Sequence, residues 1–85
     1  MEDTTEQFAL VQPIYNGDKL SPSDEHYPSQ DVRDALVLWC RRPRNETVRY
    51  RDVMDALRWD AMNKCFCFGW AGMYVGVEMD GHIHT

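Results

Sequence analysis

The 85-residue sequence lacks the motifs by which many enzymes and membrane proteins are identified. It has no glycine-rich phosphate loop, no dinucleotide-binding fingerprint and no paired-carboxylate motif. No apolar stretch approaches the ~18 residues of a membrane helix, and the start Met1-Glu2-Asp3 has the wrong charge for a signal peptide. We therefore expect a cytoplasmic protein that makes no contact with a membrane.

Cysteine and histidine are scarce, with three residues of each. Three cysteines cannot all pair with one another, so we expect reduced thiols. A cysteine nucleophile needs a neighbouring base and a third group that orients the base, and few histidines are available for that role. Structural zinc sites generally space paired ligands by about two to four residues, whereas the pairs here are separated by one. We therefore expect no enzyme activity and no cofactor. We also expect no metal site among the candidate ligands, which are Cys40, Cys65, Cys67, His26, His82 and His84.

Positive charge is scarce in the first third of the chain. Residues 1–28 contain six acidic residues and one basic residue, Lys19, whereas residues 29–85 contain eight of each. The net charge of −5 therefore belongs to the N-terminal segment.

Residues 8–15 are rich in strand-forming residues, but Pro13 lacks a backbone N–H and confines such a strand to a sheet edge. We predict an acidic N-terminal arm over residues 1–28, with a weak edge strand and a loop, followed by a folded domain over residues 29–85.

Two segments show the i, i+3, i+4, i+7 spacing of helices that face a core. The first begins after the capping residue Ser29 and ends near Arg42, before Pro43. Its apolar stripe contains Val32, Leu36, Trp39 and Cys40, widened by Val37 and Leu38. The apolar stripe of the second helix contains Tyr50, Val53, Met54 and Leu57.

Residues 60–70 support two interpretations. Asp60 can cap a third helix; alternatively the second helix continues to about Lys64 and a strand follows, because apolar and small residues alternate over 65–70. After it, residues 73–79 also alternate, and Asp80-Gly81 predicts a two-residue hairpin turn into a return strand over 82–85. The predicted fold class is α+β with two or three helices and a C-terminal β-hairpin. The alternative is two helices packed on a three-stranded antiparallel meander of residues 65–70, 73–79 and 82–85.

The order of these elements over residues 29–85 resembles the winged helix-turn-helix superfamily. Residues 47–57 look like its strand and second helix, and Trp70-Ala-Gly72 looks like the close of its third helix. The resemblance implies a DNA-binding regulator, whose third helix enters the major groove. Its nucleic-acid-binding residues are then Arg41, Arg42, Arg44, Arg49, Arg51 and Lys64. The hairpin carries Glu78 and Asp80 where DNA-binding members tend to carry bases, and this acidity favours a protein partner instead.

The stretch from residue 59 to residue 74 is dense in aromatic and sulfur-containing side chains. A chain of 85 residues has difficulty covering all of them, so we expect a partner protein or a second copy in a homodimer to cover part of this surface. The predicted partner-binding residues are Trp59, Phe66, Phe68, Trp70 and Tyr74. The sequence thus predicts a non-enzymatic protein-interaction or regulatory module. In size, acidity and lack of motifs it is similar to small accessory proteins of phages and mobile elements that bind and inhibit a host machine; the alternative is the DNA-binding regulator.

Overall fold

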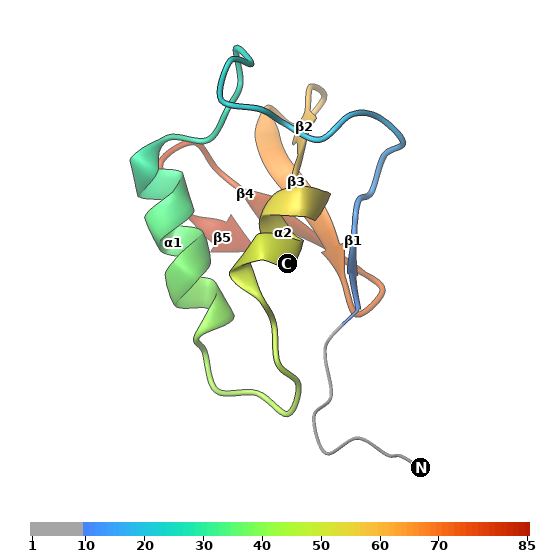
Figure 1. The fold of residues 1–85 in the computed structure, drawn as a ribbon, viewed down its shortest axis with the longest axis vertical. Coiled ribbons are helices and arrows are strands. Elements are labelled where there is room, and N and C mark those ends of the chain that lie inside the picture. The colour runs from blue at the N-terminus through green and yellow to red at the C-terminus, as the bar shows by residue number, and fades with distance from the viewer. Residues whose placement is uncertain (1–9) are drawn as a thin grey trace.

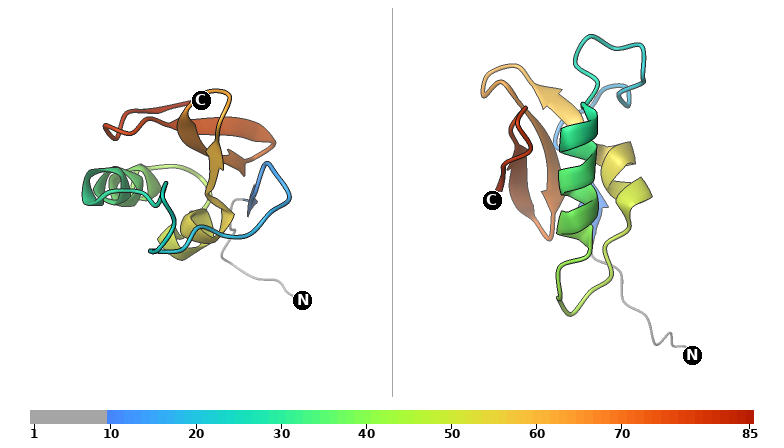
Figure 2. Two further views of the ribbon diagram at one scale, coloured as in Figure 1. Left: turned by 90° about the horizontal axis from the view of Figure 1, so that it is seen from above. Right: turned by 90° about the vertical axis from the view of Figure 1, so that its left-hand side faces the viewer.

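A computed structural model describes residues 10–85 as an antiparallel sheet with two helices packed on one of its faces (Figure 1, Figure 2). The helices are α1 (Gln30–Cys40) and α2 (Tyr50–Ala56). The strands are β1 (Val11–Gln12), β2 (Arg58–Asp60), β3 (Cys65–Trp70), β4 (Met73–Val77) and β5 (Ile83–His84). The sheet order is β1-β3-β4-β5, and β2 also pairs with β3. The predicted α+β class is confirmed, in the form of two helices on an antiparallel meander.

The strand β3 lies at the centre of the sheet. On one side it pairs with β4, with Phe68 opposite Val75. On its other side β2 pairs with its first half and β1 with its second half, which places Trp59 opposite Phe66 and Val11 opposite Trp70. Every residue of β3 except Trp70 is buried. Such a strand needs cover on both faces, and the two faces receive it from different parts of the chain.

Residues 57–70 decide between the predicted architectures. Leu57 is extended, with φ −65° and ψ 135°, so α2 ends at Ala56. Residues 61–64 form a turn, and residues 65–70 form β3. The predicted third helix and the predicted continuation of the second helix to Lys64 are therefore both wrong, whereas the strand interpretation of residues 65–70 is confirmed.

The reason that α2 stops early is a set of contacts beyond the helix. The guanidinium of Arg58 donates to the backbone carbonyl oxygens of Asp55 and Leu57 at 2.8 and 2.9 Å, so the carbonyl of Asp55 is satisfied without a further helical turn. The next residue, Trp59, packs edge-on against Phe66, with ring centroids 5.1 Å apart. Burial against β3 therefore outweighs the helical spacing of this segment.

The helix α1 begins as predicted. The Ser29 hydroxyl accepts a hydrogen bond from the backbone N–H of Val32 at 3.4 Å. Val32, Leu36 and Trp39 are buried against the sheet. Leu38, which was expected to widen this stripe, is 65% exposed, because it lies about 200° around the helix from Leu36.

Both hairpin turns use residues with positive φ. Ala71 and Gly72, at 53° and 79°, join β3 to β4 in a two-residue turn. The predicted C-terminal hairpin of β4 and β5 is present: the N–H of Glu78 donates to the carbonyl of His82 at 2.8 Å, and Gly81 has a φ of 94°. Its loop has three residues, 79–81, instead of the predicted two. Both strands of this hairpin are shorter than expected.

The described part of the predicted arm, residues 10–28, packs against the rest of the fold. Its strand β1 is an edge strand, as Pro13 indicates, and pairs with the end of β3. Leu20 packs against the core, and Pro28 is buried immediately before α1. The remainder of the arm, residues 1–9, lies outside the described residues.

The core lies between the helices and β3 and β4. Trp39 on α1 meets Phe68 and Trp70 edge-on, with centroids 5.3 Å apart in each pair. The buried residues of the cluster are Val32, Leu36, Trp39, Val48, Val53, Ala56, Leu57, Phe66, Phe68, Val75 and Val77.

We predict that Phe68→Ala lowers the free energy of unfolding by about 3–5 kcal/mol, because it leaves a cavity at the centre of this core. The control Met62→Ala removes an apolar side chain that is 92% exposed, and should change stability by less than about 0.5 kcal/mol. Urea unfolding measures both. Equal effects of the two substitutions would contradict the placement of Phe68 in the core.

Candidate functional site

The five aromatic residues predicted to bind a partner lie in different surroundings. Phe66 and Phe68 expose 1% and 0% of their surface and pack in the core between β3 and the helices. The structure corrects the prediction for these two residues, because a partner cannot reach them in this fold. Trp59, Trp70 and Tyr74 are half-buried.

Trp70 is engaged by the chain itself. The guanidinium of Arg44 lies over the rings of Trp39 and Trp70, at 4.4 and 5.2 Å from their centroids. It also donates to the backbone carbonyl oxygens of Trp39 and Cys40, at 2.9 and 3.1 Å, and so caps the C-terminus of α1. Arg44 and Trp70 therefore have a packing role.

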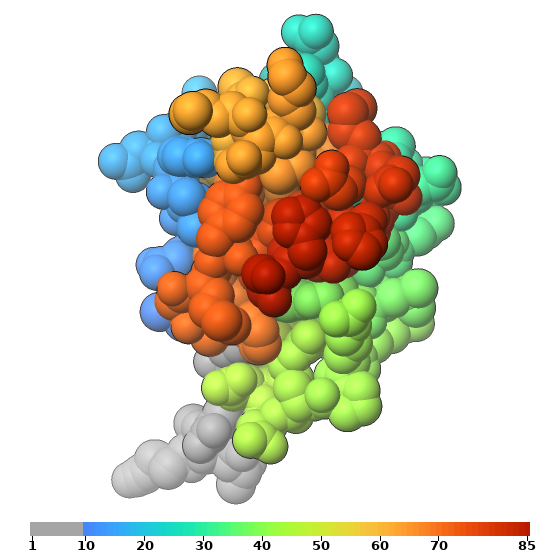
Figure 3. Space-filling view, turned by 180° about the vertical axis from the view of Figure 1, so that it is seen from behind, coloured from blue at the N-terminus to red at the C-terminus, as the bar shows by residue number. Residues whose placement is uncertain are grey.

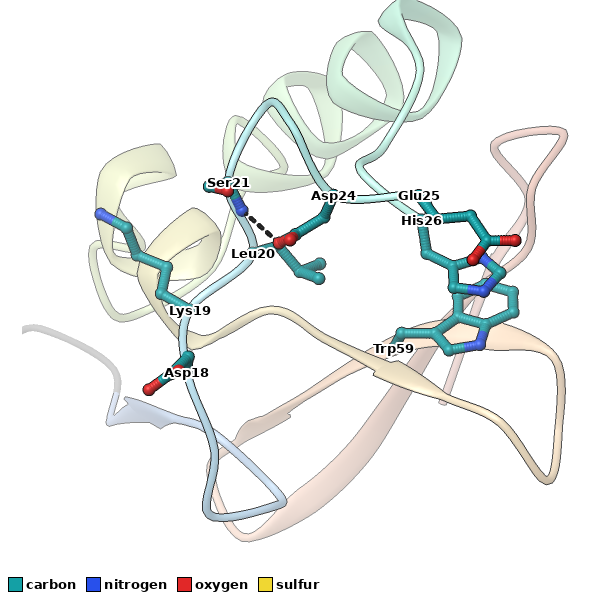
Figure 4. A pocket seen from close by; sticks show the side chains of 8 residues that line it. All are labelled: Asp18, Lys19, Leu20, Ser21, Asp24, Glu25, His26 and Trp59. Carbon is teal, nitrogen blue, oxygen red and sulfur yellow. Dashed lines mark hydrogen bonds between the residues drawn. The ribbon is translucent and has the colours of Figure 1, made fainter.

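Trp59 borders a hollow beside residues 18–26 (Figure 4). The His26 ring stacks on its indole, with centroids 4.1 Å apart and planes 4° from parallel, and so covers one face of the aromatic ring. Three carboxylates, those of Asp18, Asp24 and Glu25, line the hollow. The Asp24 carboxylate already accepts a hydrogen bond from the backbone N–H of Ser21 at 2.6 Å.

A polar cluster covers the face of β3 that is turned away from the helices, which we call the open face. The carboxylate of Asp60 is buried there and accepts four hydrogen bonds. The Tyr74 hydroxyl donates at 2.6 Å, the Asn63 side-chain amide at 2.7 Å, and the backbone N–H groups of Met62 and Asn63 at 3.0 and 3.2 Å. Sγ of Cys65 is 3.5 Å from the same hydroxyl. Asp60 thus caps a turn and fixes the Tyr74 ring.

Contacts within this cluster shift the pKa values of its acidic side chains in opposite directions. The hydrogen bonds from Tyr74 and Asn63 hold the pKa of Asp60 down at about 2, despite its burial. Burial raises the pKa of Tyr74, and hydrogen bonding to Asp60 adds to the rise. Burial, followed by the charge of Asp60, raises the pKa of Cys67 to about 11. At neutral pH the cluster therefore holds one carboxylate, a neutral phenol and a thiol.

An apolar patch borders the cluster on the open face. We define it by Leu10, Ile14, Tyr15 and Tyr74; the first three are 65%, 38% and 45% exposed. Ile14 lies over Gly69, since a Cβ on that glycine would be 3.2 Å from Cδ1 of Ile14, and Tyr74 is the cross-strand neighbour of Gly69. Figure 3 shows the segment that contains the first three residues beside the strands of this face.

Tyr15 belongs to the same neighbourhood as the polar cluster. Partial burial and the charge of Asp60 raise its pKa, with smaller contributions from Cys67 and Cys65. The sequence did not indicate Leu10, Ile14 or Tyr15, because only the pairing of β1 with β3 brings them beside Tyr74.

The predicted nucleic-acid-binding residues do not form one surface. Arg41 and Arg42 are exposed after α1, in the loop at one end of the molecule, whereas Lys64 is exposed in the turn between β2 and β3 at the opposite end (Figure 1, Figure 2). Arg49 occupies the N-cap position of α2 without a side-chain hydrogen bond to the helix, and Arg51 lies on that helix. The structure therefore divides the basic residues among at least two regions.

The potential zinc ligands are also separated. Cys65 and Cys67 are buried in β3, and Cys40 is half-buried at the end of α1. His84 lies within 2.9 Å of the Glu78 carboxylate at the exposed C-terminal hairpin. Among residues 10–85, no three histidine, cysteine, aspartate or glutamate side chains are arranged to hold a metal ion.

Comparisons of the chain with protein-family models, with curated protein sequences and with solved structures find no match. The relationship to the winged-helix superfamily therefore stays a prediction. Within the described part of the chain, neither helix has the length and apolar character needed to cross a membrane.

We predict that Asp60 makes folding sensitive to acid. Its pKa is about 2 in the folded protein and 3.8 without these contacts, so its stabilising contribution is present above about pH 4 and is lost as the pH falls towards 2. Asp60→Asn should therefore flatten the decrease in unfolding free energy over this range, as measured by urea unfolding at a series of pH values. The exposed control Asp18→Asn should follow the wild-type profile. Parallel profiles for wild type and Asp60→Asn would contradict the prediction.

Proposed function

We propose that this chain is a small, non-enzymatic protein-interaction module that binds its partner through the apolar patch on the open face. The observation that carries the proposal is that Ile14, Tyr15 and Tyr74 lie together beside the polar cluster, although β1 and β3 are far apart in the chain. Exposed apolar side chains that are contiguous and bordered by polar groups are characteristic of docking surfaces.

The patch has the composition and rigidity of an interface. Tyrosine provides a large contact area with few rotatable bonds, and it is enriched where proteins bind one another. The hydroxyl of Tyr74 is held by Asp60 at 2.6 Å, so its ring is positioned before any partner arrives. Less side-chain entropy is then lost on binding.

The state of the cysteines supports a role without catalysis. A reactive cysteine is an exposed thiolate with a lowered pKa. Cys65 and Cys67 are buried, and burial raises the pKa of Cys67 to about 11. These residues serve the packing of β3.

The separation of the basic residues favours a protein partner over the alternative of a DNA-binding regulator. Arg41 and Arg42 lie far from Lys64, and Arg44 stacks on two tryptophans. A duplex would thus meet only part of the basic set at one time. In its narrower form, the proposal is that the partner belongs to a host machine that the chain inhibits, as small accessory proteins of phages do.

The proposal predicts that Ile14→Ser combined with Tyr15→Ala weakens partner binding by at least about tenfold, since anchor residues at interfaces contribute about 2 kcal/mol or more. The control is Leu38→Ser, which removes an apolar side chain from α1 that is more exposed than Ile14 or Tyr15, at 65%. Tagged wild type and variants are used to capture partners from native host extract, and the captured protein is then titrated in purified form.

Circular dichroism checks that each variant is folded. Loss of binding in the patch variant alone supports the proposal. Equal binding by the patch variant and wild type overturns it. Duplex DNA binding that falls steeply with salt, and more gently after Arg42→Ala, would favour the DNA-binding regulator instead.

A further inference from the structure

A second hollow lies on the helical side of the molecule, away from the open face. Its walls come from α1, from α2 and from the segment that connects β1 to α1 (Figure 1). Its volume is about 500 Å³, and it is an open depression at the surface. The lining residues are Lys19, Tyr27, Arg33, Tyr50, Arg51, Met54 and Asp55.

The charges in this hollow leave two guanidinium groups without an acidic partner. Nζ of Lys19 and Oδ1 of Asp55 form an ion pair at 3.0 Å, so their charges offset one another. Arg33 and Arg51 remain, and neither guanidinium group forms a hydrogen bond or an ion pair with another residue among residues 10–85. Asp34, the residue after Arg33 on α1, accepts a hydrogen bond from Gln30 at 2.8 Å.

The Arg33 side chain is partly enclosed in spite of its charge. Its Nε is buried and has no hydrogen-bond partner among the described residues. Its guanidinium lies over the Tyr27 ring, 5.6 Å from the centroid, which restricts its position. A buried donor without a partner is costly.

Aromatic and apolar side chains form the remaining wall. Tyr50 begins α2, and Met54 lies one turn further along the same face. Burial raises the pKa of Tyr50; the charge of Arg33 opposes the rise, and the charge of Asp34 adds to it. A ligand in this hollow therefore meets guanidinium groups together with aromatic and apolar side chains.

We infer that this hollow binds a small aromatic phosphate monoester, with the phosphate between Arg33 and Arg51 and the ring against Tyr50 and Met54. Guanidinium groups match the oxygen geometry of phosphate in paired hydrogen bonds. The chain as a whole carries a charge of −5, and this hollow places two cations that have no ion-pair partner in one lining, where they attract an anion. The site is independent of the proposed partner-binding patch, which lies on the other side of the sheet.

The test is to titrate the full chain separately with phenyl phosphate, inorganic phosphate and benzoate. Calorimetry and amide chemical shifts measure binding. We expect saturable binding of phenyl phosphate with a Kd of about 1 mM or tighter, stronger than that of inorganic phosphate, with shifts centred on α1 and α2. Arg51→Gln and Arg33→Gln should each weaken it by about tenfold or more, because each removes a charged hydrogen bond. Arg42→Gln, which changes an exposed arginine outside the hollow, should have no effect.

Arg51 is exposed, so its substitution should leave the fold intact. The Arg51 variant therefore still tests the inference if the Arg33 variant unfolds. Absence of saturable binding overturns the inference, as does an equal loss of affinity in Arg42→Gln. Benzoate binding as tight as that of phenyl phosphate would assign the hollow to carboxylates and overturn the phosphate assignment. None of these results bears on the open-face patch, whose variants Ile14→Ser and Tyr15→Ala should bind phenyl phosphate as the wild type does.

Discussion

Burial of β3 on both faces is the constraint on which the rest of the fold depends. One face carries Phe66 and Phe68, which are covered by α1 and α2. The other carries Cys65 and Cys67, which have no helix above them and are covered by the Asp60 and Tyr74 cluster and by the chain that leaves β1. Both helices lie on the first face, so the second face needs another kind of cover. A satisfied polar network on the second face meets this need, because four hydrogen bonds offset the cost of burying one carboxylate.

This division gives the two sides of the molecule different chemistry. The thin cover of the open face leaves Ile14 and Tyr15 partly exposed and holds Tyr74 in place, which suits contact with another protein. The helical side is covered more thickly, and the gap that remains between the helices is bordered by arginine and tyrosine side chains. Each region follows from how β3 is covered. Neither the apolar patch nor the hollow includes Phe66 or Phe68, because both side chains are buried in the core.

Local patterns predicted the helices and the terminal hairpin well. Ser29 caps α1, the stripe of Val32, Leu36 and Trp39 is buried, and Asp80-Gly81 turns the chain between β4 and β5. These features depend on interactions within a few residues, so spacing and capping chemistry are sufficient to predict them. The end of α2 could not be predicted in this way. Its spacing continues past Ala56, and the helix stops because Arg58 satisfies the carbonyls and Trp59 packs against a strand that comes later in the chain.

The sequence by itself determined the α+β class, the first helix, the final hairpin and the uneven charge, because each depends on residues that are close together in the chain. Tertiary structure alone decided which aromatic residues are core and which are surface, since alternation along β3 does not say which face the helices cover. It also decided that Asp60 would cap a turn and hold Tyr74, that Ile14 would lie over Gly69, and that Arg33 and Arg51 would share one hollow. These contacts join residues far apart in the chain, and only the pairing of the strands and the packing of the helices brings them together.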